Sequence, residues 1–103
     1  MKTILFYHAM EDILDKYNSR WHIEAAVPDS RGIVVSIYSN IYGVHAIFGI
    51  ECYGHNKVYF SSMWMIDSID HSLFSNEISD VVEELNNIWA DIEDAFNGNA
   101  IEY

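Results

Sequence analysis

Several histidines and a glutamate are placed where they could work as a general acid and base. His22 and Glu24 share one face of a segment that alternates apolar and polar residues, as a half-buried strand does. Across a sheet this pair could meet polar residues of other predicted strands and turns, which are His45, Glu51 and His55. Arg20 lies on the same face and could steady a phosphate, so a small hydrolase of the ribonuclease kind is one hypothesis.

The spacing of these residues is not diagnostic of catalysis. A catalytic site for a polyanion would need a basic surround, because cations neutralise the phosphates, and this chain lacks one. Exposed strand histidines with a structural role or none are the simpler interpretation. We therefore keep a hydrolase that uses His22, Glu24 and His45 as an alternative, and we expect that the protein is not an enzyme.

Metal and nucleotide sites are not indicated either. Cys52 and His55 are separated by two residues, but no second pair of ligands follows at zinc spacing. Asp67, Asp70 and His71 do not form a calcium-binding loop, and the glycines have no phosphate-loop context. We expect no metal and no cofactor, and Cys52 is most simply a small core residue.

A more distinctive feature of the sequence is the run of carboxylates in residues 75–96. The apolar residues of this segment recur at steps of three and four and predict a helix with one buried stripe, formed by Ile78, Val82, Leu85, Trp89, Ile92 and Phe96. The opposite arc carries Asp80, Glu84, Asn87, Asp91 and Asp94, flanked by Glu77 and Glu83. No Lys or Arg is interleaved with them. The sequence therefore predicts an uncompensated anionic face directed to solvent.

The spacing of these carboxylates resembles that of a nucleic-acid backbone. At ~1.5 Å rise per residue they supply about one charge per 4 Å, against ~3.4 Å per phosphate in one DNA strand. Like charges such as Asp80 and Glu84 repel by a few tenths of a kcal/mol, so local stability does not explain them. The partner-binding residues predicted on this helix are Glu77, Asp80, Glu83, Glu84, Asp91 and Asp94. The alternative is that an acidic surface keeps the protein soluble.

The charge of the whole chain has the same sign and an uneven distribution. The net charge is −11, all five basic residues lie in the first 57 positions, and ten acids follow Lys57 without Lys or Arg. Such a surface opposes direct binding of nucleic acid and favours basic protein surfaces.

One cysteine allows no intramolecular disulfide, and the apolar runs are short. We expect a soluble protein of the cytoplasm, of the host cell if phage-encoded, with no signal peptide.

The elements that must position these residues form one α+β domain over residues 1–103. Residues 4–17 read as a first amphipathic helix with Thr3 as N-cap. Strands are predicted at 20–27, 33–38, 44–53 and 57–66, with turns at 28–32, 39–43 and 54–56. Along the first strand, Ile23, Ala25 and Val27 point inward, and Trp21, Trp64 and Trp89 belong to the core. The third strand has Val44, Ala46, Phe48, Ile50 and Cys52 on one side. The expected architecture is a four-stranded antiparallel meander with both helices on one face, in the order αββββα.

The other face of the sheet carries apolar residues of its own. Tyr59, Ser61, Met63 and Met65 point away from the helices if the fourth strand has the register we favour, and Val34, Tyr38 and Ile47 join them. The inward and outward sets of that strand could be exchanged, since it is apolar on both sides. A partly apolar outer face indicates contact with loops, a second copy or another protein. Tyr59 and Met63 are therefore further candidate partner-binding residues.

In composition and layout, the chain resembles the small acidic inhibitors that phages use against nucleic-acid-binding defence proteins, such as CRISPR effectors and restriction enzymes. The resemblance implies a non-enzymatic DNA mimic that binds a basic nucleic-acid-binding protein. The order α, β, β, β, α also occurs in double-stranded RNA-binding domains, whose basic face is missing here. The alternative function is an immunity protein or secretion-chaperone-like adaptor that binds through the outer sheet face of Tyr38, Tyr59, Met63 and Met65.

Overall fold

The fold is an α+β arrangement of one sheet and two helices. The computed structural model describes the backbone of residues 3–28, 32–53, 57–59, 65–69 and 75–102, and the side chains of residues 3–28, 32–50, 78–99, 101 and 102. In chain order the elements are β1 (Thr3–Leu5), α1 (Phe6–Asp15), β2 (His22–Pro28), β3 (Gly32–Ser39), β4 (Val44–Tyr53), β5 (Lys57–Tyr59), β6 (Met65–Ile69), α2 (Ser75–Phe96) and β7 (Ala100–Glu102).

Strands β2, β3 and β4 form the antiparallel centre of the sheet, as predicted, but the four-stranded meander is wrong in detail. Along the described chain the strand order is β1-β7-β5-β4-β3-β2, and β6 also pairs with β4. Of the predicted strand at 57–66, the structure describes β5, beside Glu51–Tyr53, and the start of β6, beside Val44–Ile47, and residues 60–64 lie outside the described residues. The predicted order αββββα also lacks β1 and β7, which pair in parallel beyond β5.

A bulge in β2 reverses the predicted inward and outward sets of that strand. Ile23 pairs with Ile37 in β3, but the register shifts before Ala25, which pairs with Ser36. The extra residue is Glu24, and inserting one residue moves every later side chain to the other face. Ala25 and Val27, predicted to point inward, are exposed, Val27 to 57%.

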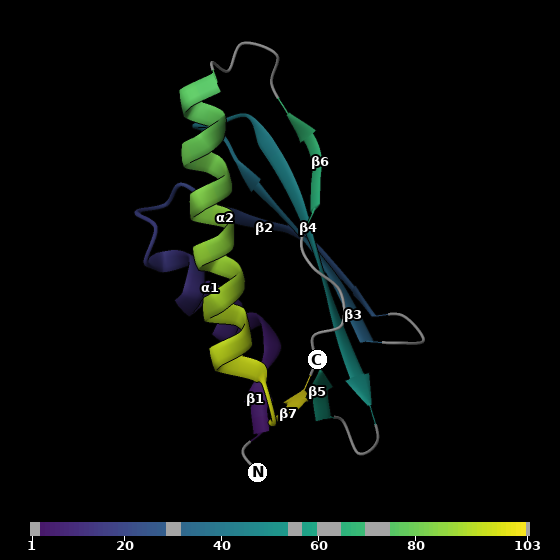
Figure 1. Cartoon of the computed structure of the whole chain (residues 1–103). Coiled ribbons are helices and arrows are strands. Elements are labelled where there is room, and N and C mark those ends of the chain that lie inside the picture. Colours follow the sequence, from purple (N-terminus) through teal and green to yellow (C-terminus); the bar gives the residue numbers. More distant parts are fainter. Residues whose placement is uncertain (1–2, 29–31, 54–56, 60–64, 70–74, 103) are drawn as a thin grey trace.

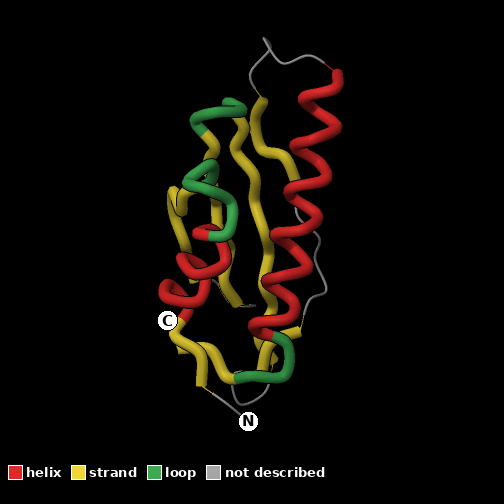
Figure 2. The backbone as a smooth tube through the Cα atoms, turned by 90° about the vertical axis from the view of Figure 1, so that its left-hand side faces the viewer, coloured by secondary structure: helices red, strands yellow, loops and turns green. Residues whose placement is uncertain are grey.

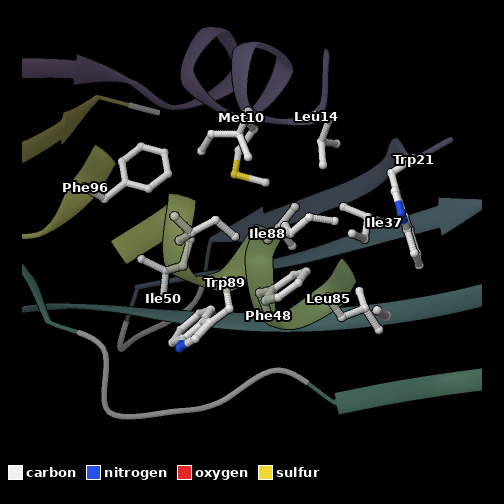
Figure 3. Close-up of a cluster of buried hydrophobic side chains, with 14 of the residues drawn as sticks. Met10, Leu14, Trp21, Ile37, Phe48, Ile50, Leu85, Ile88, Trp89 and Phe96 are labelled. Carbon is white, nitrogen blue, oxygen red and sulfur yellow. The ribbon is translucent and has the colours of Figure 1, made fainter. Parts of the chain in front are cut away.

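Both helices cover the same face of the sheet, as predicted (Figure 1), and in Figure 2 they lie in front of the strands. Of the residues predicted to share one side of β4, Val44, Ala46, Phe48 and Ile50 are buried, and the side chain of Cys52 lies outside the described residues. Phe48 stacks on Trp89 of α2 with ring centroids 5.8 Å apart, as Figure 3 shows. Trp21 is also buried, as predicted, whereas Trp64 lies outside the described residues.

Helix α1 begins later than predicted and is antiparallel to α2. Thr3, the predicted N-cap, belongs to β1, and Leu5 occupies the cap position without a side-chain hydrogen bond. Phe6 stacks on Phe96 at 5.7 Å, so the start of α1 lies beside the end of α2. After α1 the chain turns at Asn18 and Ser19, whose φ angles of 54° and 60° are incompatible with a continued helix.

The buried stripe of α2 is rotated relative to the prediction. Its buried side chains are Val81, Leu85, Ile88, Trp89, Ile92 and Phe96. Ile78, predicted to be buried, is 37% exposed, and Val82 is half-buried. Both sets repeat at steps of three and four, so periodicity alone did not distinguish them. Within the described residues, neither helix is long and apolar enough to cross a membrane.

Candidate functional site

The predicted anionic face of α2 is divided by the fold. Asp80, Glu83 and Asp94 are exposed, as expected for partner-binding residues. Glu84 and Asp91 instead contact the segment between α1 and β2. The prediction that both point freely to solvent is therefore wrong. Glu77 lies in α2, but its side chain is outside the described part of the chain.

Glu84 accepts hydrogen bonds from three side chains of other segments. Its Oε1 accepts from Arg20 Nε and from Trp21 Nε1, each at 2.8 Å, and its Oε2 accepts from the Tyr42 hydroxyl at 3.1 Å. The Glu84 side chain is only 11% exposed. A carboxylate with three donors is well compensated for its partial burial. Glu84 thus ties α2 to the segments on either side of β2 and β3.

Asp91 makes a second, weaker connection of the same kind. Its Oδ2 accepts a hydrogen bond from the Tyr17 hydroxyl at 2.9 Å and lies 3.9 Å from Lys16 Nζ. The Asp91 side chain is 27% exposed and that of Lys16 is 64% exposed. The ion pair is screened by water and adds little stability, so the tyrosine hydrogen bond is the main contact.

These contacts shift the pKa values of the groups that donate to the two carboxylates. Burial, followed by the hydrogen bond to Asp91, raises the pKa of Tyr17. Burial and the hydrogen bond to Glu84 raise the pKa of Tyr42, and the Glu84 hydrogen bond raises that of Arg20. Each shift favours the protonated donor. The two tyrosine hydroxyls therefore keep their protons to higher pH than an ordinary tyrosine does.

Both helices carry exposed acids. The segment after α1 is attached to α2 by the contacts of Tyr17 with Asp91 and of Arg20 with Glu84. We define the acidic helical surface as the exposed acids of the two helices, which are Glu11, Asp12, Asp15, Asp80, Glu83, Glu93 and Asp94. Of these, Glu11 and Asp15 lie on the side of α1 that faces β2. Among the described side chains the basic residues are Lys16 and Arg20, and each already contacts an acid.

The α2 part of this surface has two acidic ends and a neutral middle. Asp80 and Glu83 form one end, and Glu93 and Asp94 the other. Between them the exposed residues Asn86, Asn87 and Ala90 carry no charge. The ten helical steps from Glu83 to Glu93 span about 15 Å at ~1.5 Å each. The predicted even spacing of carboxylates along one side of the helix is therefore replaced by two separated clusters on α2.

The outer face of the sheet contains the glutamate and histidine predicted as an acid and base pair. His45 Nδ1 lies 2.8 Å from Glu24 Oε2, and the Ser36 hydroxyl donates to the same oxygen at 3.1 Å. The hydrogen bond from His45 lowers the pKa of Glu24. The Tyr38 ring lies 4.6 Å from that of His45. The pair is thus part of an exposed cross-strand cluster.

Other residues of the hydrolase hypothesis do not join that cluster. Among the described residues, His22 makes no hydrogen bond to Glu24 or His45, although it pairs with Tyr38 in the β2–β3 ladder. The side chain of Glu51 and the whole of His55 lie outside the described residues. The Ser36 hydroxyl donates to Glu24, but the hydrogen bond from His45 lowers the pKa of that carboxyl group and so makes it a weaker base.

The outer sheet face is partly apolar, as predicted. Val34 is 37% exposed, and Tyr38 and Ile47 are half-buried on the side away from the helices. Tyr59 pairs with Glu51 in the β4–β5 ladder, but its side chain is not described, and Met65 in β6 has the same status. Met63 and Ser61 lie outside the described residues.

No signal in the sequence distinguished Glu84 from its neighbours. Its donors Arg20 and Trp21 are 64 and 63 positions away, and Tyr42 is 42 positions away. In the described part of the chain, no group of three or more His, Cys, Asp or Glu residues is placed to hold a metal ion. No protein-family model, curated protein or solved structure matches this chain.

Proposed function

We propose that this protein is a small acidic, non-enzymatic inhibitor that binds a basic nucleic-acid-binding surface of a host defence protein. In this proposal it is of the phage type, an anti-CRISPR or anti-restriction protein that acts as a DNA mimic. The observation that supports it most directly is the acidic helical surface, seven exposed carboxylates on two adjacent helices. Lys16 and Arg20 are both paired with acids outside this set.

The contacts of Glu84 and Asp91 support this proposal in an indirect way. They anchor α2 to the segment that follows α1, so the exposed acids of the two helices sit on a rigid support. Charges that are already held in place lose less conformational entropy when a partner binds. Glu84 and Asp91 are therefore positioning residues in the revised proposal, and the contact residues are those of the acidic helical surface.

The test compares two variants with the same change in net charge. Asp80→Asn with Glu83→Gln removes two charges from the acidic helical surface, while Val27→Lys with Val34→Lys adds two cations on the sheet. All four positions are exposed. The purified wild type and variants are immobilised and incubated with a panel of purified CRISPR effectors and restriction enzymes. Displacement of labelled DNA from each member of the panel is measured.

The wild type should displace DNA from one member of the panel at low salt. The helical double variant should do so about tenfold less well, because rim charges control encounter, and the sheet double variant should retain activity. Displacement should weaken steeply between about 0.05 and 0.5 M NaCl, since exposed charges are screened over about 10 Å at 0.1 M. Equal affinity of wild type and the helical variant contradicts the proposal.

The outer sheet face supports a second candidate function, an immunity protein or secretion-chaperone-like adaptor. Its supporting observation is the exposed apolar pair Val27 and Val34, on the face that the helices leave open. For this candidate the effects of the two double variants are reversed. Val27→Lys with Val34→Lys abolishes capture of a protein partner from a host lysate, and salt has little influence.

A further inference from the structure

A groove lies between α1 and the outer edge of β2. Its volume is about 490 Å³, within the range of protein ligand sites. One wall comes from α1, with Tyr7, Glu11 and Asp15, and the other from the residues that lead into and form β2, including His22 and Ala25. Leu14, Trp21 and Ile23 supply apolar surface.

The β2 wall is the end of the sheet. In the described chain β2 is the last strand of the order and pairs with β3 on one side. The bulge at Glu24 and Pro28 at the strand end limit addition of a long new strand, because both interrupt a regular ladder. A segment that lies in the groove must therefore be held largely by side chains, from the α1 wall.

The α1 wall is acidic and regularly spaced. Tyr7, Glu11 and Asp15 follow one another at intervals of four residues and are all exposed. Among the described residues, neither Glu11 nor Asp15 forms an ion pair, since Lys16 pairs with Asp91 and Arg20 with Glu84. The groove thus presents carboxylates that a cation can approach, beside an aromatic ring.

The spacing of Glu11 and Asp15 determines which arrangement of basic residues can pair with both carboxylates. Residues four apart on a helix are about 6 Å apart along its axis, at ~1.5 Å per residue. Alternate side chains of an extended chain lie about 6.6 Å apart on one side, at ~3.3 Å per residue. Two basic residues separated by one other residue can therefore meet Glu11 and Asp15 together. Their aliphatic stems would cover the apolar surface of the groove.

We propose that this groove binds an extended segment of the partner in which lysine or arginine alternates with other residues. Each of two alternate cations pairs with Glu11 or Asp15, and the Tyr7 ring adds a cation–π contact at one end. The inference rests on the proposed function, because it takes the partner to be basic. It adds a defined docking site, separate from Asp80 and Glu83.

The test uses synthetic peptides, so it needs no identified partner. A fluorescent heptapeptide of alternating lysine and valine is titrated with the full-length protein at about 50 mM NaCl, and anisotropy is recorded. A second peptide has the same composition, with its lysines adjacent. The variants are Glu11→Gln with Asp15→Asn and Ala25→Phe, which fills the groove without a charge change. The control is Val34→Lys with Asn40→Lys, which makes the same change in net charge at two exposed positions outside both the groove and the acidic helical surface.

The alternating peptide should bind more tightly than its isomer. Glu11→Gln with Asp15→Asn should weaken binding about fivefold, as expected for two exposed ion pairs, and Ala25→Phe should weaken it similarly. Val34→Lys with Asn40→Lys should change it less than about twofold. Circular dichroism checks that every variant is folded.

Three results would overturn the inference: no binding of the alternating peptide, equal binding of the two peptides, or equal losses in the two charge variants with no effect of Ala25→Phe. None of these results affects the comparison of DNA displacement between the wild type and the variant Asp80→Asn with Glu83→Gln. Failure of the groove and failure of the proposed function are therefore distinguishable.

Discussion

Glu84 shows how one residue can be mistaken for part of a binding surface. It follows Glu83 in the sequence and has the same side chain, yet its carboxylate accepts from Arg20, Trp21 and Tyr42 while Glu83 is exposed. A substitution at Glu84 leaves three donors without their acceptor. Charge reversal of Glu84 or Asp91 would therefore disturb the fold as well as any interface, and neither position gives a clean test of binding.

We predict that Glu84→Ala lowers the free energy of unfolding by about 2–3 kcal/mol, because hydrogen bonds to a charged group are lost and their donors stay partly buried. The matched variant Glu83→Ala should change it by less than about 0.5 kcal/mol, as exposed substitutions do. Urea denaturation followed by tryptophan fluorescence measures both. Similar values for the two variants would show that Glu84 is not an anchor.

Tyr42, which donates to Glu84, limits the stability of the folded protein at alkaline pH. The folded-state pKa of Tyr42 is raised, as is that of Tyr17, so folding favours the protonated hydroxyl. The resulting stability is fully present below the unfolded tyrosine pKa of about 10 and is lost as the pH rises above it.

We therefore predict that the free energy of unfolding falls as the pH rises beyond about 10. Tyr42→Phe should be less stable than wild type by about 1 kcal/mol at neutral pH, since one hydrogen bond is lost. It should also lose less stability in alkali, and Tyr17→Phe with Tyr42→Phe less still. Denaturation curves from pH 7 to about 11 would measure this, and parallel pH profiles for the three proteins would contradict it.

Among the elements, α2 is the one whose orientation matters most for function. Its buried stripe includes Val81 and Ile88, whereas Ile78 is exposed. A rotation of this kind decides which acids face solvent and which face the rest of the domain. The β2 bulge has a comparable effect, because it places Ala25 and Val27 at the surface, and Ala25 in the wall of the groove.

The orientation of α2 can be tested with two identical substitutions. We predict that Ile88→Ala costs about 2–5 kcal/mol of stability, because it leaves a cavity in the core, and Ile78→Ala less than about 1 kcal/mol. Ile88 is 0% exposed and Ile78 is 37% exposed. Chemical denaturation of both variants gives the comparison. A larger loss for Ile78→Ala than for Ile88→Ala would show that Ile78 belongs to the buried stripe, as the sequence periodicity predicts.

Over the whole molecule, the net charge of −11 opposes folding as well as directing binding. The exposed acids within each helix repel their neighbours through solvent, where salt screens them. The internal contact of Arg20 with Glu84 is partly buried, so added salt affects it less. Salt should therefore have opposite effects on the stability of the protein and on its affinity for a basic partner.

We predict that raising NaCl from about 0.02 to about 0.2 M increases the free energy of unfolding by a few tenths of a kcal/mol to about 1 kcal/mol. The gain should be smaller in Asp80→Asn with Glu83→Gln and larger in Asn87→Asp, which extends the charge into the neutral middle of α2. Thermal denaturation at each salt concentration measures the change. A loss of stability with salt would show that internal ion pairs dominate.

Local patterns in the sequence predicted the α+β class, the two helices on one face, the inward residues of β4 and the acidity of the helical layer. These features depend on periods of 3.6 and 2 residues and on composition, which neighbouring residues express directly. The rotation of α2, the engagement of Glu84 and Asp91, the bulge at Glu24 and the β1–β7 pair came from the tertiary structure. Each depends on contacts across the fold, as between Tyr17 and Asp91, 74 positions apart, or on ladder pairing that alternation within one strand does not specify.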